Sequence, residues 1–205
     1  MAIDYYASDV PGVRGWIQEY CGRALLNLIN IIPTSVIKKS PNPQETSQEL
    51  TRKACIAAGL QSATLTLPAG PFGILTAVPD LLNVWRIQAQ LIADIAACHG
   101  RPHAISKNEM AWCLFRHSAS QISRDFLVHN SERLLVATLS GKALTSILRR
   151  IGAHSVERLS GRLAIRFIPI LGMGISGGLA WWDTHQVGKT ALKLFSEQDP
   201  TIAPP

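Results

Sequence analysis

The chain has 205 residues, of which 47% are hydrophobic and only 6% aromatic, and it carries a formal net charge of +6. This length suits one domain with a sizeable core, and the composition favours helices packed through Leu, Ile, Ala and Gly over an aromatic-rich core. The basic balance favours an acidic partner without deciding among lipid, nucleic acid and protein.

The first 44 residues predict an amphipathic helix followed by an exposed linker. The opening MAIDYYASD has neither the basic start nor the apolar run of a signal peptide, so we expect retention in the cytoplasm. Apolar residues recur on one helical face from Trp16 to Ile32, and Pro33 ends the pattern. The prolines and lysines of residues 34–44 are typical of a linker.

An uncharged stretch at residues 54–79, ACIAAGLQSATLTLPAGPFGILTAVP, organises the chain. A helix that begins near Glu45 continues into it, and the prolines and glycines of its LPAGPFG segment stop that helix. We therefore expect an apolar hairpin that returns at Asp80. Asp80 stands where an N-cap residue would stand, ahead of a long amphipathic helix that ends at Gly100.

Three further helices are predicted before the second apolar stretch. Ser106 and Glu109 have the spacing of a capping box, and they open a helix that extends to about residue 128. Two more helices are predicted over about 132–151 and 155–167 from their apolar periodicity and the breakers that follow them.

A second uncharged stretch, FIPILGMGISGGLAWW, covers residues 167–182. It precedes Asp183, which we expect to cap a last helix that ends at Phe195. The arrangement repeats that of the first stretch: an apolar segment with prolines and glycines, an aspartate, then a helix with a polar face. The sequence thus predicts an all-α fold, a single helical domain of about seven helices with two glycine- and proline-containing apolar hairpin segments.

The runs VPDLLNVWRIQAQLIADIAACHG and IPILGMGISGGLAWWDTHQVGKTALKLF resemble the pattern of the EcsC family, bacterial proteins named for a gene beside an ABC-transporter pair. The shared features are a Pro-Asp step into a helix that ends near a glycine, and a glycine-rich apolar segment before a final helix. The resemblance covers roughly residues 45–197, so we expect residues 1–44 as an N-terminal helix and linker and 198–205 as a disordered tail. It implies an all-helical, membrane-associated accessory protein, with no catalytic residues to carry over.

The glycines of the second stretch match a nucleotide-binding motif in letters but not in context. Gly172, Gly174 and Gly177 have the G-x-G-x-x-G spacing, which needs a preceding strand and a βαβ unit. The surroundings here predict helix. We therefore interpret Gly172, Gly174, Gly177 and Gly178 as positions of close helix packing, and we expect no cofactor.

Four metal-ligating side chains lie near one another in sequence. Cys98, His103, Cys113 and His117 would suit tetrahedral zinc, but their spacing fits no finger pattern. Buried, reduced thiols beside a core histidine explain them better, and Cys21 and Cys55 also lie in apolar contexts. We expect no metal, no disulfide and no catalytic residues.

Two aspartates directly follow the apolar stretches, and each has two interpretations. Asp80 and Asp183 are favoured as helix caps. They are also candidates for buried carboxylates that meet Arg86, Arg166 or Lys189 at a site between the two apolar segments.

The basic charge is concentrated ahead of the second stretch. The cations are Arg149, Arg150, Arg158, Arg162 and Arg166, and only Glu157 opposes them. The last three recur every four residues and share one helix face. Such a face is either solvated or a contact for anions, and its position beside an apolar stretch favours anionic lipid.

The favoured function is a non-enzymatic, membrane-associated accessory role on the cytoplasmic face, linked to transport or export. The expected partners are an anionic membrane surface and a membrane protein, with the apolar segments as re-entrant or interfacial elements rather than spanning helices. One rival is a soluble helical module that binds nucleic acid or protein, although no nucleic-acid recognition motif accompanies the arginines. The other rival is an enzyme whose site the sequence does not reveal.

Overall fold

The computed structural model describes residues 20, 23, 24, 27, 28, 30–65, 73–102, 105–119 and 169–197. Its helices there are α2 (Pro43–Leu65), α3 (Gly73–Cys98), α4 (Lys107–Ala119) and α8 (Pro169–Glu197), and the scattered positions between 20 and 30 are helical too. Because no strand occurs in these ranges, the all-α prediction is confirmed. The helices predicted over 132–151 and 155–167 lie outside the described residues.

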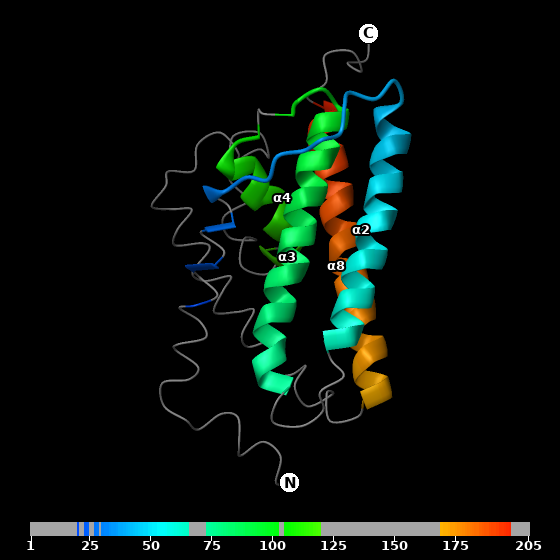
Figure 1. Ribbon diagram of the computed structural model, residues 1–205. Coiled ribbons are helices and arrows are strands. Elements are labelled where there is room, and N and C mark those ends of the chain that lie inside the picture. Colours follow the sequence, from blue (N-terminus) through cyan, green and yellow to red (C-terminus); the bar gives the residue numbers. More distant parts are fainter. Residues whose placement is uncertain are drawn as a thin grey trace.

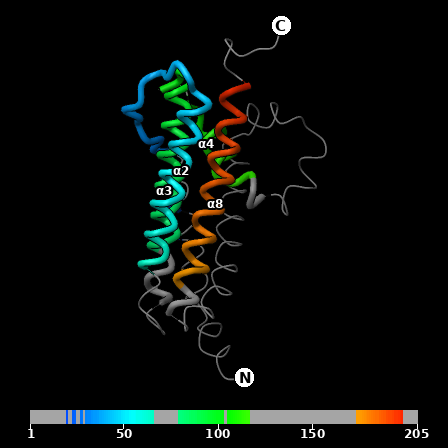
Figure 2. Tube along the Cα trace, turned by 90° about the vertical axis from the view of Figure 1, so that its right-hand side faces the viewer, coloured from blue at the N-terminus to red at the C-terminus, as the bar shows by residue number. Residues whose placement is uncertain are grey.

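Three long helices, α2, α3 and α8, lie side by side (Figure 1). Contacts between Ser47 and Cys98 at one end and between Ser62 and Asp80 at the other show that α2 and α3 are antiparallel. The first apolar stretch therefore folds back as a hairpin, as predicted. Helix α8 runs antiparallel to α2 and parallel to α3, and Figure 2 shows it beside α2 along its length.

Helix α2 packs closely because its buried residues are small. Ser47, Thr51, Cys55, Ala58 and Ser62 recur every three or four positions and form its buried face. The first two satisfy their hydroxyl groups within the helix, since each donates to the carbonyl four residues earlier at 2.7 Å. A row of small side chains with satisfied polar groups lets neighbouring helices approach this face.

The starts of α3 and α8 differ from the prediction. Helix α3 begins at Gly73, so Asp80 is an interior residue that follows Pro79 and does not cap the helix. A proline removes one backbone hydrogen bond without excluding helix, and the packing of α3 on α2 offsets that loss. Helix α8 begins at Pro169 and continues past Asp183, so this aspartate is not a cap either. From residue 169 onward the second apolar stretch is therefore part of a single continuous helix. The prediction that it forms a hairpin is wrong.

The end of α3 follows the prediction closely. Gly100 has a φ of +85°, which a residue with a side chain rarely adopts. Its N–H donates to the carbonyl of Ala97, and the N–H of Arg101 donates to that of Ala96, which together form a Schellman motif. The N–H of Ser40 satisfies the carbonyl of Cys98 at 2.9 Å, so the segment before α2 also helps to close this helix.

Helix α4 starts with the predicted capping box. The Glu109 carboxylate accepts the N–H of Ser106 at 2.7 Å, and the Ser106 hydroxyl accepts the N–H of Glu109 at 3.2 Å. Arg101 donates to the same carboxylate at 3.2 Å, and its guanidinium lies 5.5 Å from the centre of the Phe195 ring. This cluster joins the end of α3, the start of α4 and the end of α8.

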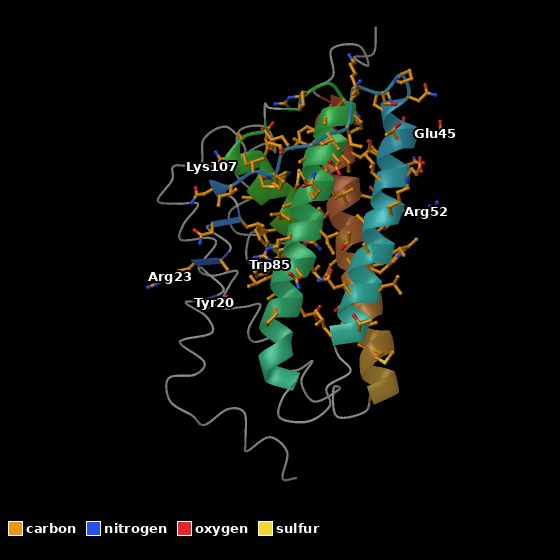
Figure 3. All side chains as sticks on the ribbon, in the orientation of Figure 1. Tyr20, Arg23, Glu45, Arg52, Trp85 and Lys107 are labelled. Carbon is orange, nitrogen blue, oxygen red and sulfur yellow. The ribbon has the colours of Figure 1, made fainter. Side chains whose placement is uncertain are left out.

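The main core lies where α3, α4 and α8 meet. Its largest fully buried side chains are Phe195, Ile92, Ile95, Met110, Leu114 and Val187. Trp85, labelled in Figure 3, packs edge-on against Phe115 with ring centres 5.9 Å apart. None of the described helices is both long enough and apolar enough to cross a bilayer.

We predict that the Glu109 side chain contributes to stability mainly through the hydrogen bond that its carboxylate accepts from the Ser106 N–H. Glu109→Gln keeps an acceptor for the Ser106 N–H and should cost less than about 1 kcal/mol, whereas Glu109→Ala should cost about 1–2 kcal/mol. Urea unfolding of both variants measures the difference. Equal losses would show that the charge opposite Arg101, rather than the capping box, is what matters.

Candidate interaction surface

The uncharged ends of three helices gather at one end of the bundle. Helix α2 ends there, and α3 and α8 begin there, at the lower end in Figure 1. The helical residues concerned, 54–65, 73–79 and 169–182, contain no Asp, Glu, Lys or Arg. The opposite end carries the charged residues of the same helices, including Glu45 and Arg52, which point away from α3 and α8 in Figure 3. The bundle is therefore polarised along its length.

Helices α2 and α8 come close together at two glycine positions of α8, Gly177 and Gly188. A Cβ on Gly177 would lie 2.8 Å from the carbonyl oxygen of Gly59, and one on Gly59 would lie 3.2 Å from the carbonyl oxygen of Gly177. Nearer the charged end, a Cβ on Gly188 would lie 2.5 Å from the Thr51 side chain. Only glycine fits at positions 177 and 188 without displacing the neighbouring helix.

The outer side of the α2–α8 pair exposes large apolar side chains. Ile56 and Leu60 lie one turn apart on α2, and Ile175, Trp181 and Trp182 project from α8. Leu60 is 64% exposed and Trp182 is 55% exposed, values that are high for such residues. We call these five residues the apolar face. An exposed apolar cluster of this kind is typical of a surface that contacts a membrane or another protein.

Basic residues border the apolar face on the side of the charged end. Arg52, Lys53 and Lys189 are exposed there, and Lys53 pairs with Glu49 at 2.7 Å. That hydrogen bond and the charge of Lys53 hold the pKa of Glu49 below its usual value. The surface thus combines apolar and cationic parts.

A histidine links the two parts of this surface. The His185 ring stacks on Trp181 with ring centres 5.2 Å apart. Partial burial and the charge of Lys189 lower the pKa of His185, which favours the neutral form of the ring. The stack therefore adds to the apolar face without adding charge.

Buried polar contacts connect the helices behind this surface. The Ser62 hydroxyl donates to the Asp80 carboxylate at 2.9 Å between α2 and α3, and Gln88 donates to the Thr184 hydroxyl at 3.3 Å between α3 and α8. All four residues are buried. Because such groups are costly to bury without partners, these contacts favour one pairing of the helices over shifted ones.

Cys98 and His99 lie together at the charged end without forming a reactive pair. The His99 Nδ1 atom lies 2.9 Å from the carbonyl of Ile95, which only accepts, so Nδ1 carries the proton and does not take one from the Cys98 thiol 3.5 Å away. Burial raises the pKa of Cys98, raises that of Cys55 to about 11 and raises that of Cys113 further. These three thiols are free and un-ionised near neutral pH.

Of the four candidate zinc ligands, only Cys98 and Cys113 have described side chains. Cys98 contacts Ser47 and the end of α3, and Cys113 is buried in α4. No cluster of three potential ligands occurs among the described residues. Cys21, His103 and the side chain of His117 lie outside them.

The glycines of α8 divide into two kinds. Gly177 packs closely as predicted, whereas no atom of the described residues lies within 4 Å of a Cβ added at Gly174 or Gly178. At these two positions close packing stays a prediction, without a contact among the described residues. All three lie inside a helix, which is not the strand-to-helix turn that a dinucleotide fingerprint requires. The packing around Gly172 lies outside the described part of the structure.

Four of the charged candidates, Asp80, Arg86, Asp183 and Lys189, lie at described positions. Asp80 is buried between α2 and α3, Asp183 is partly buried on α8, and Arg86 is exposed 3.4 Å from the Asn83 amide oxygen. The structure gives no ion pair between Arg86 and either aspartate. Arg149, Arg150, Arg158, Arg162 and Arg166 lie outside the described residues, so the arginine stripe stays a prediction.

Comparison with protein-family models, with curated proteins and with solved structures found no match for this chain.

Several residues of the site carry only weak signals in the sequence. Gly59 and Gly188 are single glycines inside helical patterns, which is a known sign of close backbone approach. Gln88 and Thr184 lie on predicted helices, but a one-dimensional pattern does not pair positions 96 residues apart. The second apolar stretch was expected to lie at a membrane interface, but the sequence did not single out Trp181 and Trp182 as its exposed residues, because an uncharged run does not mark which of its positions face outward.

Gly177 and Gly178 form a matched pair for testing the α2–α8 contact. Gly177→Ala should destabilise the fold by about 1–3 kcal/mol because its Cβ meets the Gly59 carbonyl. Gly178→Ala should be neutral or stabilising by about 1 kcal/mol, since it adds helix propensity where no described atom obstructs the new methyl group. Chemical denaturation of both variants gives the comparison, and similar stabilities would contradict the close approach.

The buried contact between Ser62 and Asp80 is tested by a double-mutant cycle. Asp80→Ala and Ser62→Ala each remove one partner, and Asp80→Ala should cost about 1–3 kcal/mol. If the contact couples the helices, the double variant should lose less than the sum of the single losses by about 0.5–3 kcal/mol. Strictly additive losses would show that the two side chains act independently.

Proposed function

We propose that this chain is a non-enzymatic accessory protein that associates with the anionic surface of a membrane, on its cytoplasmic face. The observation that carries this proposal is the gathering of three uncharged helix ends at one end of the bundle, next to the exposed apolar face. A soluble fold usually covers such side chains, and an apolar region beside a charged one suits the boundary between lipid tails and headgroups.

The composition of the surface favours a bilayer interface. Trp181 and Trp182 are amphipathic rings of the type enriched at headgroup depth. The cations Arg52, Lys53 and Lys189 lie beside them, where anionic headgroups would meet them. The free, buried thiols of Cys55, Cys98 and Cys113 suit a reducing compartment, which supports the cytoplasmic side.

The rival functions have less support. A module that binds protein would use the same apolar face, so it stays the alternative that the membrane experiment must address. For a nucleic-acid-binding module, the described cations border an apolar patch and do not form a broad basic surface. For an enzyme, the cysteine that lies beside a histidine has a raised pKa, and the histidine nitrogen nearest to that thiol carries a proton and does not act as its base.

The first test is flotation of the purified protein with liposomes. The double variant Trp181→Ser/Trp182→Ser should lose most of the recovery with liposomes that contain anionic lipid. Val36→Ser is the matched control, because Val36 is 94% exposed and lies outside the apolar face. Absence of wild-type flotation on any liposome would refute the membrane role and leave the protein-binding alternative.

The electrostatic part of the proposal is tested with neutral liposomes and with variants in which glutamine replaces the cations. Each basic residue near an anionic surface is worth about 1 kcal/mol, so Arg52→Gln/Lys53→Gln/Lys189→Gln should weaken binding by up to about 3 kcal/mol. Arg158→Gln/Arg162→Gln/Arg166→Gln tests the arginine stripe on the same scale. Equal wild-type recovery with neutral and anionic lipid would contradict the electrostatic part of the proposal.

A further inference from the structure

The part of helix α8 from Gly174 to Trp182 exposes uncharged residues on one side, and we call this side the ridge. Glycines without a side chain and large apolar side chains are interspersed along it. Gly174 and Gly178 are exposed, and no described atom lies within 4 Å of a Cβ added at either position. Ile175, Trp181 and Trp182 project from the adjoining positions of the same helix. The ridge therefore offers two notches and three large side chains within about two and a half turns.

The order of these residues makes the ridge complementary to itself. When two α8 helices pair antiparallel about an axis at Gly178, position 174 of one copy faces position 182 of the other, and 175 faces 181. Each tryptophan at 182 then meets a glycine notch at 174, and Ile175 meets Trp181. The two copies of Gly178 meet at the axis, where the absence of side chains permits close approach.

The fold already uses one glycine of this segment in the same way. Gly177, on the adjacent side of α8, receives the backbone of α2 at Gly59. Gly174 and Gly178 are exposed, and no described residue of α2 or α3 lies within 4 Å of a Cβ added at either of them. Lipid would make no specific contact with the gaps left by these glycines. A tryptophan side chain from a second helix would fill such a gap and make van der Waals contacts there.

Charge selects the antiparallel orientation. Lys189 lies 11 residues beyond Gly178 on α8, and Arg52 lies toward the same end of α2. A parallel pair would place these cations of two copies beside each other, where they repel. An antiparallel pair moves them to opposite ends and leaves only uncharged residues at the centre.

We propose that a second copy of this chain binds this ridge and forms a two-fold symmetric, antiparallel dimer centred near Gly178. Ile56 and Leu60 on the same outer side of α2 flank the contact and extend it. The proposal does not rest on membrane association. It does place Trp181 and Trp182 in the dimer, so self-association and membrane binding compete for these two side chains.

Cysteine cross-linking of the full, lipid-free chain tests the geometry directly. In a Cys21→Ser background, a Gly178→Cys variant should form an intermolecular disulfide under mild oxidation, because the two copies of position 178 meet at the axis. Lys189→Cys is the matched control, since antiparallel helices hold its two copies about 33 Å apart at 1.5 Å per residue. The proposal requires cross-linking at 178 to be at least about tenfold faster than at 189. Equal rates at the two positions, or no cross-link at 178, would overturn it.

Sedimentation over a range of protein concentrations tests the steric basis in the chain without added cysteine. Gly178→Leu fills the space at the axis and should raise the dimer dissociation constant by about tenfold or more. The thermal midpoint should be kept or raised, because no described atom lies within 4 Å of a Cβ added at this position. Gln48→Leu, at an exposed position of α2 outside the ridge, should leave the constant unchanged. A wild-type chain that stays monomeric at high concentration, or a Gly178→Leu variant that dimerises as the wild type does, would contradict the proposal.

Discussion

The close backbone approach of α2 and α8 is the constraint on which the rest of the structure depends. At Gly59 and Gly177 each helix faces the other with bare backbone, and at Gly188 the Thr51 side chain fills the space that a Cβ would need. This approach places the uncharged half of α8 beside the uncharged half of α2. The polarised bundle, in which the uncharged stretches 54–65, 73–79 and 169–182 gather at one end, follows from that pairing.

The interior contains polar contacts that an apolar core would not need. Ser62 with Asp80 and Gln88 with Thr184 lie at different levels of the bundle, and each joins a different pair of helices. Because the side chains between α2 and α8 are small, few large side chains oppose a shift of one helix along the other. Specific buried hydrogen bonds raise the free energy of the shifted pairings and so favour a single register.

The exposed surface follows from the same packing. Helix α8 turns one side to α2, α3 and α4 and is left with a second side, which is also uncharged as far as Trp182. Burying both sides would require another layer beyond the apolar face, and in the structure Trp182 and Leu60 remain largely exposed. Both proposals, association with a membrane and pairing with a second copy, are ways of covering this second side.

Local signals in the sequence determined the helical class, the fold-back of the first apolar stretch, the Schellman end at Gly100 and the capping box of Ser106 with Glu109. Each depends on residues within a few positions of one another, where backbone geometry and side-chain hydrogen bonding act without help from the rest of the chain. The same local reasoning misplaced Asp80 and Asp183 as caps, because proline and glycine weaken an isolated helix but are tolerated in one that packs on neighbours.

Only the tertiary structure decided which uncharged residues are buried and which are exposed. Gly177 and Gly178 are adjacent and chemically identical, yet one meets the backbone of α2 and the other has no described atom within 4 Å of an added Cβ. Trp85 is buried against Phe115, whereas Trp182 lies outside. The reason is geometric: a run without charges lacks the polar positions that mark the outer side of a helix, so its orientation is set by the helices it packs against.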